Sequence, residues 1–283
     1  MELTVISGKG GTGKTSIAVA IAELERNTVK VDCDVDAPNF YLYYDGNDAS
    51  CEDFSGGKKV VVDEELCISC GLCQDACQFS AIENGLVDFL NCEGCGACVL
   101  VCPTQAASLK EEKTADIFVT DTGKGILSRA EVEIGSEGSG KLITILRKAA
   151  KPYTDGKITV SDGSPGIGCP VISSITGTDA VLIVTEPTQS GMEDLGRVVT
   201  LCRQFKILIF VCINKVDINK QISTEIEEYC LEKNLLLAGR IPYDDTVLRS
   251  INELKPIIFY SESPANEAIR QMWKTIKKEI FKD

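Results

Sequence analysis

The chain has 283 residues, of which 44% are hydrophobic, so it can bury one large core or two modest ones. Its formal net charge of −13 argues against sequence-independent binding of nucleic acid. No apolar run approaches the roughly 20 residues that cross a bilayer. The first predicted strand, over 3–6, leads straight into a glycine-rich loop and follows no signal peptide. We therefore expect a cytoplasmic protein.

The chain contains 14 cysteines and no histidine. In a cytoplasmic protein, so many cysteines favour metal binding or catalysis over disulfides. Without histidine, metal ligands must be thiolates and carboxylates, and no imidazole can act as a general base.

The glycine-rich loop separates the strand over 3–6 from a predicted helix over 16–25. Residues 8–15 read GKGGTGKT, the GxxxxGK[ST] pattern in the strand–loop–helix context that it requires. Its backbone N–H groups and the helix N-terminus favour a bound phosphate. Lys14 is predicted to contact the β- and γ-phosphates, and Thr15 to bind Mg²⁺. The predicted nucleotide-binding residues here are Lys9, Gly10, Gly11, Thr12, Gly13, Lys14, Thr15 and Ser16.

A second predicted strand, over 28–31, runs into a group of carboxylates. Open α/β sheets place their sites at such strand ends. Asp34 is our first candidate to orient an attacking water and is also a predicted Mg²⁺ ligand. Asp32 is the second candidate and would act through Mg²⁺; phosphoryl transfer depends on this kind of positioning. We interpret Asp36 as a turn residue.

Residues 45–57 are polar and glycine-rich and predict a linker. After it come two arrays of four cysteines, each spaced CxxCxxCxxxC. In doubled arrays of this kind, three close cysteines and the fourth cysteine of the other array ligate each 4Fe-4S cluster. Zinc is the competing metal for CxxC pairs, but the doubled spacing favours two clusters. The predicted ligand sets are Cys67, Cys70, Cys73 and Cys102 for one cluster, and Cys77, Cys92, Cys95 and Cys98 for the other.

Strands and helices alternate again in the rest of the chain. We predict strands over 157–161, 179–185 and 206–213, and helices over 142–151 and 188–205. Asp162, directly after the first of these strands, is predicted to bind Mg²⁺. The last strand runs into Asn214-Lys215-Val216-Asp217, an NKxD sequence that could indicate guanine recognition. Residues 135–141 also spell GxxxxGK, but Leu142 replaces the Mg²⁺-binding hydroxyl, so we interpret them as a loop before a helix.

The early lysine of KGGTGKT, the DxD followed by Pro38 and the DGSPG at 162–166 together resemble the MinD/ParA/Mrp group of P-loop ATPases. This group has a deviant Walker A motif and belongs to the SIMIBI type. The resemblance implies a doubly wound, mostly parallel α/β sheet. The cysteine arrays resemble a small α+β bacterial-type ferredoxin domain inserted into it. The implied ATPase domain is discontinuous, 1–57 and 114–283, around a ferredoxin-like domain at 58–113.

The resemblance also implies roles for individual residues. In the MinD-like group the early lysine, here Lys9, reaches across a dimer interface to the partner's nucleotide, which implies an ATP-sandwich homodimer. A lysine that binds phosphate within its own chain is the alternative. An asparagine at the position of Asn214 contacts adenine in that group, and 241–244, which include Pro242, resemble its adenine-side loop. ATP is therefore favoured over GTP.

Two further features leave alternatives open. Cys169 lies in the segment that resembles switch II, where the nitrogenase iron protein has a cluster ligand. It is either a transient metal site or a structural thiol. The stretch over 265–282 is amphipathic, and MinD uses such a helix to bind membranes. Packing on the sheet is the reading that we favour.

We expect hydrolysis of ATP to ADP and phosphate, with Lys14, Lys9, Asp34 and Asp32 as the catalytic residues. The expected cofactors are ATP, Mg²⁺ and two 4Fe-4S clusters. The first functional hypothesis is nucleotide-gated electron transfer to, or metal-centre assembly on, a client protein. The alternatives are a MinD- or ParA-like spatial or scaffolding ATPase with redox-sensing clusters, and a plain electron carrier. No nucleic-acid partner is expected.

Overall fold

The structure, a computed structural model, describes residues 1–134, 136 and 139–281. Contacts within the chain divide it into two compact units. The first consists of Met1–Cys51, Ile117–Ala130 and Gly138–Asp283, and the second of Glu52–Asp116 and Glu131–Glu137. None of the described helices combines the length and the apolar character that a membrane span requires.

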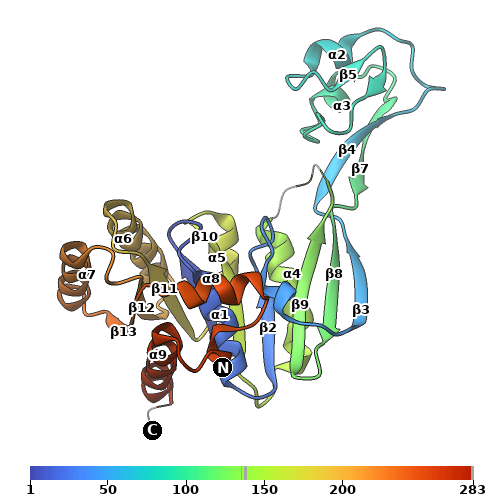
Figure 1. Cartoon of the computed structure of the whole chain (residues 1–283). Coiled ribbons are helices and arrows are strands. Elements are labelled where there is room, and N and C mark those ends of the chain that lie inside the picture. Colours follow the sequence, from blue (N-terminus) through green and yellow to red (C-terminus); the bar gives the residue numbers. More distant parts are fainter. Residues whose placement is uncertain (135, 137–138, 282–283) are drawn as a thin grey trace. The chain divides into compact units, whose positions relative to one another are not determined.

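A central sheet organises the first unit (Figure 1). Its strands are β1 (Glu2–Ser7), β2 (Thr28–Asp32), β3 (Asn47–Phe54), β8 (Ala115–Asp121), β9 (Gly125–Val132), β10 (Thr159–Pro165), β11 (Ala180–Thr185), β12 (Leu208–Asn214) and β13 (Leu236–Ile241). Over the described residues they lie in the order β13-β12-β11-β1-β10-β2-β9-β8-β3. Every pairing from β13 to β9 is parallel. The predicted mostly parallel α/β fold is therefore confirmed.

Both faces of this sheet are apolar. On β1, Leu3 and Val5 enter one core cluster, whereas Ile6 enters the other. On β12, Phe210 joins the first cluster and Val211 the second. Successive side chains of a strand point to opposite faces, so a strand covered on both sides is apolar along its length. This is why the central strands appear in the sequence as continuous apolar runs.

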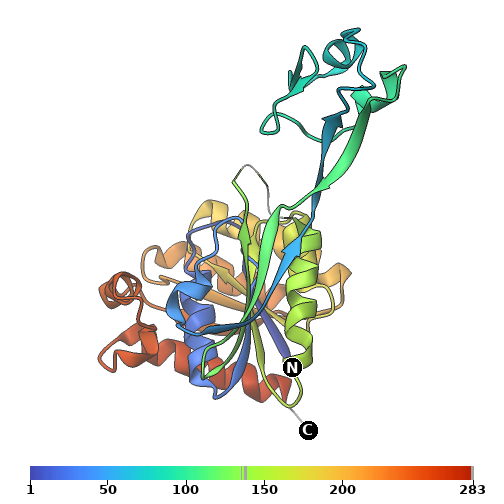
Figure 2. The same cartoon turned by 90° about the vertical axis from the view of Figure 1, so that its right-hand side faces the viewer.

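Helices cover the two faces of the sheet (Figures 1 and 2). They are α1 (Lys14–Leu24), α4 (Gly140–Ala150), α5 (Cys169–Ile175), α6 (Gln189–Gln204), α7 (Lys220–Glu232), α8 (Asp245–Asn252) and α9 (Pro264–Ile280), with the 3-10 turns η1 (Phe40–Tyr43), η2 (Lys151–Tyr153) and η3 (Ile257–Phe259). Residues of α1 and α9 build the first core cluster, and residues of α5, α6 and α7 the second. The helices predicted over 142–151 and 188–205 correspond to α4 and α6.

The amphipathic stretch at the end of the chain is α9, and its apolar stripe is buried. Ile269, Met272, Trp273 and Ile276 are each at most 2% exposed. They belong to the same core cluster as α1, and Trp273 Nε1 donates a hydrogen bond to Glu25 at 2.7 Å. The stripe thus packs on the sheet and on α1, and it is not presented to a membrane.

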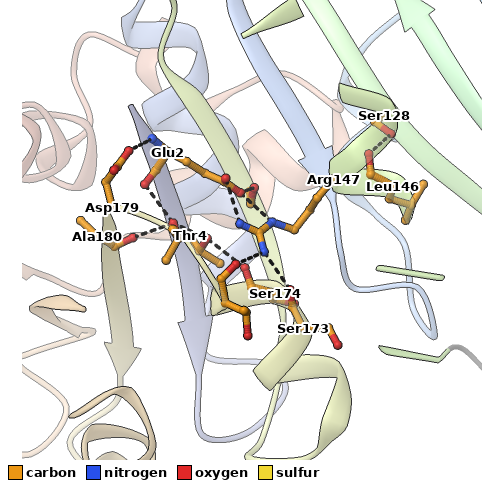
Figure 3. Close-up of polar contacts among 12 residues, drawn as sticks. Glu2, Thr4, Ser128, Leu146, Arg147, Ser173, Ser174, Asp179 and Ala180 are labelled. Atoms are coloured by element: carbon orange, nitrogen blue, oxygen red, sulfur yellow. Dashed lines mark hydrogen bonds and ion pairs between the residues drawn. The ribbon is translucent and has the colours of Figure 1, made fainter. Parts of the chain in front are cut away.

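A partly buried arginine ties α4 and α5 to the sheet (Figure 3). Arg147 of α4 donates two hydrogen bonds to the carboxylate of Glu2 on β1, both at 2.9 Å. It also donates to the carbonyls of Ser173 and Thr176 at the end of α5. Ser161 of β10 donates to the same carboxylate at 3.0 Å. Bidentate arginine–carboxylate pairs are directional, so this network fixes both helices against the strands that carry the candidate site.

The linker predicted over 45–57 is wrong for most of its length, because 47–54 form the outer strand β3. Most β3 side chains are exposed, so the strand shows no apolar alternation. Polar contacts hold it in place. Thr120 of β8 donates to Asp48 at 2.6 Å, and Arg129 of β9 lies 3.5 Å from the other oxygen of that carboxylate. Charged side chains are typical of edge strands, and no pattern in the sequence predicted β8 or β9.

The second unit contains two short antiparallel ribbons. One pairs β4 (Gly57–Val62) with β7 (Ala107–Glu112), and the other pairs β5 (Ile82–Glu83) with β6 (Leu86–Val87). Two one-turn helices, α2 (Leu72–Ala76) and α3 (Ala97–Val101), complete the described part of the unit. Its small core consists of Val60, Ala81, Ile82, Cys92, Cys98 and Ala107. Cysteines therefore replace much of the aliphatic core of a domain of this size.

The two cysteine arrays fold alike locally. Gly71 precedes α2 with φ 78°, and Gly96 precedes α3 with φ 79°. This left-handed conformation is open to glycine at little cost, which explains why a glycine occupies the same place in both arrays. The repeat in the sequence is thus also a repeat in backbone geometry.

If α9 is part of the core, Ile276→Ala should destabilise the protein by about 2–5 kcal/mol, as deletion of a buried aliphatic side chain does. Lys274→Ala, at an exposed position of the same helix, should change the free energy of unfolding by less than about 0.5 kcal/mol. Urea unfolding followed by the fluorescence of Trp273, the one tryptophan of the chain, measures both. Equal effects would contradict the packing of α9.

Candidate functional site

The glycine-rich loop connects β1 to α1 in a geometry that only glycine adopts readily. Gly11 has φ 78° and Gly13, the residue before α1, has φ 86°. A Cβ atom on Gly13 would lie 2.5 Å from Nδ2 of Asn214. That same Nδ2 donates to the carbonyl of Thr12 at 2.8 Å. Asn214, at the end of β12, thus holds the loop in place. The backbone N–H groups of the loop lie at the start of a helix, where anions bind.

Lys14 is the centre of the site. Its side chain is 6% exposed, and Nζ lies 2.7 Å from Oδ1 of Asp162 and 3.1 Å from Oδ2 of Asp34. Thr15 Oγ1 donates to the other oxygen of Asp162 at 2.6 Å. Burial lowers the pKa of Lys14, but the two carboxylates outweigh burial, and its pKa is raised. One ammonium group therefore joins the loop, the end of β10 and the segment after β2.

Asp32 supports this cluster from behind. Its two oxygens accept hydrogen bonds from the backbone N–H groups of Asp34 at 3.3 Å and Phe40 at 3.1 Å. Burial, followed by the nearby Asp162, raises the pKa of Asp32 to about 8. Burial also raises the pKa of Asp34, although Lys14 opposes it. The structure thus brings together the predicted residues Lys14, Asp32, Asp34 and Asp162, and it gives Asp32 a role in shaping the segment up to Phe40.

A cavity of 470 Å³ opens beside Lys14. The loop lines it together with Asp34 and Asn39 from the segment after β2, and with Ser164 and Pro165 of β10. This volume is in the range of small-molecule sites. The hydroxyl of Thr15 and the carboxylates of Asp34 and Asp162 are hard oxygen donors of the kind that Mg²⁺ prefers. The residues present therefore fit a nucleotide with Mg²⁺.

Lys9 is held within its own chain in this structure. Its Nζ donates to the hydroxyls of Thr188 and Ser190, each at 3.2 Å, and lies 4.0 Å from the carboxylate of Glu186. Lys215 pairs with that same carboxylate at 2.6 Å. These contacts neither support nor oppose the two roles that the sequence leaves open for Lys9.

The NKxD sequence lies next to the end of β13. Asp217 accepts a hydrogen bond from the backbone N–H of Tyr243 at 2.7 Å, which ties the two loops together. Pro242 lies between Tyr243 and Ile241, the last residue of β13. Asn214 is engaged with the glycine-rich loop, as described above. The structure therefore places Asn214 beside the loop and Pro242 in the neighbouring connection.

The first predicted set of cluster ligands surrounds one cavity of the second unit. Cys67, Cys70, Cys73 and Cys102 all line a cavity of 330 Å³. Gly85 also lines it, and a Cβ atom there would lie 3.8 Å from Sγ of Cys67. Four thiols from both arrays around one space fit the ligand set of a 4Fe-4S cluster.

The second set surrounds a much smaller space. Cys77, Cys92, Cys95 and Cys98 line a cavity of 20 Å³. The backbone N–H of Ala81 donates to Sγ of Cys77 at 3.3 Å. Each array again contributes, as the predicted crossover of the fourth cysteine requires. The pairing fits a cluster, although the walls must move apart to admit one. As they stand, the described side chains include no group of three or more that could hold a metal ion.

Two other predicted features can be placed. Cys169 is exposed and is the first residue of α5, beside Pro170. Pro170 lines the cavity beside Lys14, and both readings of Cys169 stay predictions. Of the 135–141 look-alike motif, Gly135, Glu137 and Gly138 lie outside the described residues. Lys141 is in the first turn of α4.

Sequence reasoning missed several residues of the site. Glu186, Thr188 and Ser190 hold Lys9, and Ser164 donates to the carbonyl of Cys33 at 2.7 Å, which joins β10 to the segment after β2. The position of Glu186 in the sequence could have predicted its place in the site. It directly follows β11, the strand next to β1, and the carboxyl ends of parallel strands meet at one edge of the sheet.

Comparisons with known proteins agree with this geometry. The model of the CobQ/CobB/MinD/ParA nucleotide-binding domain matches residues 3–257. An uncharacterized protein of Methanocaldococcus jannaschii is 34% identical over 283 residues, 99% of this chain and 98% of that protein. A ferredoxin of Pyrobaculum islandicum is 39% identical over 64 residues, 21% of this chain and 60% of its own length.

Solved structures agree on the fold. MinD of Pyrococcus horikoshii, solved with Mg-ADP, has a TM-score of 0.61 at 18% identity and covers 99% of this chain and 97% of its own. MinD of Aquifex aeolicus, solved in a MinC:MinD complex, has a TM-score of 0.58 at 16% identity and covers 98% and 96%. At such identities the likeness concerns the fold alone.

The raised pKa of Asp32 predicts a pH-dependent stability. Between the ordinary value of 3.8 and about 8, the folded protein keeps a proton that the unfolded chain has lost, so stability falls as pH rises through this window. Asp32→Asn removes the titrating group. In nucleotide-free protein, the free energy of unfolding of the variant minus that of the wild type should therefore increase from pH 6 to 8 and level off above.

Urea titrations at four pH values measure this difference. Asp36→Asn, at an exposed carboxylate of the same segment, should leave the pH dependence of the wild type unchanged. A difference for Asp32→Asn that stays constant with pH would contradict the raised pKa.

Proposed function

Because the chain belongs to the CobQ/CobB/MinD/ParA nucleotide-binding family, we propose that it is an ATPase that couples nucleotide binding to two 4Fe-4S clusters. Its output would be gated electron transfer to a client protein, or assembly of a metal centre on one. The family and the MinD-like fold are the premises. The coupling and the clusters are the proposal, and the next paragraphs give the contacts that support them.

One observation carries the proposal: the ammonium group of Lys14 is bound to Asp34 and Asp162. A phosphate group that enters the loop competes for the same ammonium group. It would draw Lys14 away from both carboxylates, which lie on two different segments of the chain. Nucleotide binding is thus chemically linked to the conformation of those segments.

The residues of the cavity supply what hydrolysis of ATP requires. Lys14 and the loop N–H groups would bind and orient the phosphates, and phosphoryl transfer depends mainly on such positioning and charge stabilisation. Thr15 and Asp162 would hold Mg²⁺, which neutralises phosphate charge when bound. Asp34, freed from Lys14, would accept a hydrogen bond from a water and orient it, while Asp32 holds the segment through the N–H groups of Asp34 and Phe40.

The same segment leads along the chain to the cysteines. From Asp34 it passes through η1 into β3, and the chain then continues into the second unit. Ser164 of β10 is also bonded to this segment, through the carbonyl of Cys33. Changes at Asp34 and Asp162 would therefore reach β3 along the backbone. This connection supports gating of the cluster module by nucleotide.

The cysteine chemistry supports a redox role for the second unit. Each predicted set of four thiols lines one cavity, and the partial match to a ferredoxin falls on a segment of similar length. Clusters held there would accept and donate single electrons. We further propose an ATP-sandwich homodimer in which Lys9 leaves Glu186, Thr188 and Ser190 and reaches the partner's nucleotide.

Lys14→Ala should lower kcat for ATP hydrolysis by about 100-fold or more, because loss of one electrostatic donor to a transition state has that effect. Lys141→Ala, which alters the lysine of the look-alike motif, should change kcat by less than about twofold. Phosphate release under anaerobic conditions measures both. A similar loss in the two variants would contradict the assignment of the site.

Mg-ATP should shift the reduction potential of at least one cluster in the wild type, and Lys14→Ala should abolish the shift. An anaerobic EPR titration with and without Mg-ATP measures this. If two normal clusters keep their potentials in the presence of nucleotide, redox gating is wrong. ATP hydrolysis would then serve metal-centre assembly or a scaffolding role.

The reconstituted wild type should contain about eight iron atoms per chain, and Cys70→Ser or Cys95→Ser should each lose about half, because each set of thiols holds a four-iron cluster. Cys51→Ser and Cys169→Ser, at exposed cysteines outside both sets, should keep the full content. Iron and sulfide assays check this. One zinc ion for each set of four cysteines would contradict the cluster assignment.

A further inference from the structure

The stretch 66–101 of the second unit exposes more large apolar side chains than its length predicts. Of 23 exposed large hydrophobic side chains among the described residues, nine lie between residues 66 and 101. They are Leu66, Ile68, Leu72, Phe79, Leu86, Phe89, Leu90, Leu100 and Val101. Exposed apolar groups gathered in this way mark docking surfaces in soluble proteins. The stretch that carries the cysteines is therefore also the stretch that another molecule can cover.

The charge of this stretch has one sign. Between Val60 and Leu109 there is no lysine, arginine or histidine, whereas seven carboxylates are present and all are exposed. They are Asp63, Glu64, Glu65, Asp75, Glu83, Asp88 and Glu93. Such a surface repels nucleic acid and anionic lipid and attracts cationic groups. The covering molecule must therefore present a positive rim.

The two cysteine-lined cavities differ in volume and in the exposed residues around them, and this difference indicates which one a partner would contact. The larger, lined by Cys67, also has Ile68 and Leu72 in its wall, 64% and 45% exposed. Leu66 and Leu86, next in sequence to the lining residues Cys67 and Gly85, are 51% and 74% exposed. We call these four aliphatic residues, with Glu64 and Glu65, the port face.

The smaller cavity, of 20 Å³, has a lysine bonded to its wall. Lys59 Nζ donates to the carbonyls of Phe89 and Cys92, each at 2.8 Å, and so clamps the loop that leads into the second array. Cys92 and Cys98 are each only 7% exposed. Lys59 is 17% exposed and lies 3.9 Å from the carboxylate of Glu112, so it adds little positive charge to this surface. A partner nevertheless finds less open cysteine surface here than at the larger cavity. The larger cavity is therefore the better place for a partner to exchange electrons with a cluster.

We infer that the port face docks a redox protein whose contact patch is apolar at its centre and ringed by lysine and arginine. The apolar residues of the port face would fill the dry centre of the contact, and Glu64 and Glu65 would pair with the rim, an arrangement that steers association and fixes orientation. One electron would pass between the cluster held by Cys67, Cys70, Cys73 and Cys102 and the partner. No bond forms or breaks, and a low-potential one-electron donor reduces the cluster beforehand.

This inference rests on the proposed clusters, but docking itself can be measured without electron transfer. The probe is ferricytochrome c, a basic redox protein. Isothermal titration at low salt gives its Kd for the oxidised full-length chain. Glu64→Lys with Glu65→Lys should raise Kd at least about tenfold. The matched control, Glu93→Lys with Glu111→Lys, makes the same change in net charge. Glu93 lines the smaller cavity and Glu111 lies two residues after its lining residue Leu109, so this control should raise Kd less than about threefold.

A second pair tests the apolar centre. Ile68→Ser, in the wall of the larger cavity, should weaken binding about fivefold or more, whereas Phe79→Ser, in the wall of the smaller one, should have less than a twofold effect. Stopped-flow reduction of ferricytochrome c by the dithionite-reduced chain should slow in the same order. Hexaammineruthenium(III), a small acceptor that needs no docking face, should be reduced at similar rates by Ile68→Ser and Phe79→Ser.

Equal effects of the matched pairs, or larger effects near the smaller cavity, would overturn the port face. Iron content is determined for every variant. If port-face variants alone weaken binding in a chain that holds no iron, docking stands and the proposed redox function fails. If clusters are present and binding shows no preference for the port face, the proposed function stands and this inference fails.

Discussion

The contact on which the site depends is the buried ammonium group of Lys14 between Asp34 and Asp162. Asp32, 1% exposed, adds a third carboxyl group to the same neighbourhood. Buried carboxylates need cations or protons nearby, and one lysine cannot balance three of them. The raised pKa of Asp32 is one response to this excess. A second cation, as proposed above for Mg²⁺ bound with a nucleotide, would be another.

This shared cation also explains how the site is connected to the rest of the molecule. Asp162 lies on β10, next to β1, and Asp34 follows β2 on the other side of β10. Arg147 holds α4 and α5 against the amino-terminal part of the same strands. Through Glu2 this contact joins β1 and β10, and the segments that carry Asp34 and the loop begin beyond these strands. The segment that carries Asp34 leads to β3 and from there into the cysteine module.

The cysteine module shows how a repeat can produce unlike halves. Gly71 and Gly96 give the two arrays the same turn, yet their ligand sets line cavities of 330 and 20 Å³. The asymmetry comes from the surroundings, where Lys59 clamps the second array and Cys92 is buried in the small core. Two similar sequences thus acquire different exposure and different charge environments.

The sequence by itself determined the loop, the order of the central elements and the candidate carboxylates, because backbone motifs and apolar runs are local. It also defined the two cysteine sets, and the structure collects each set around one cavity. Only the tertiary structure decided what depends on contacts between distant residues. β3 is a strand because Thr120 and Arg129 hold Asp48, not because of any pattern in 47–54. Likewise, the contacts of Lys9 with Glu186 and of Asn214 with Thr12 join parts of the chain that only folding brings together.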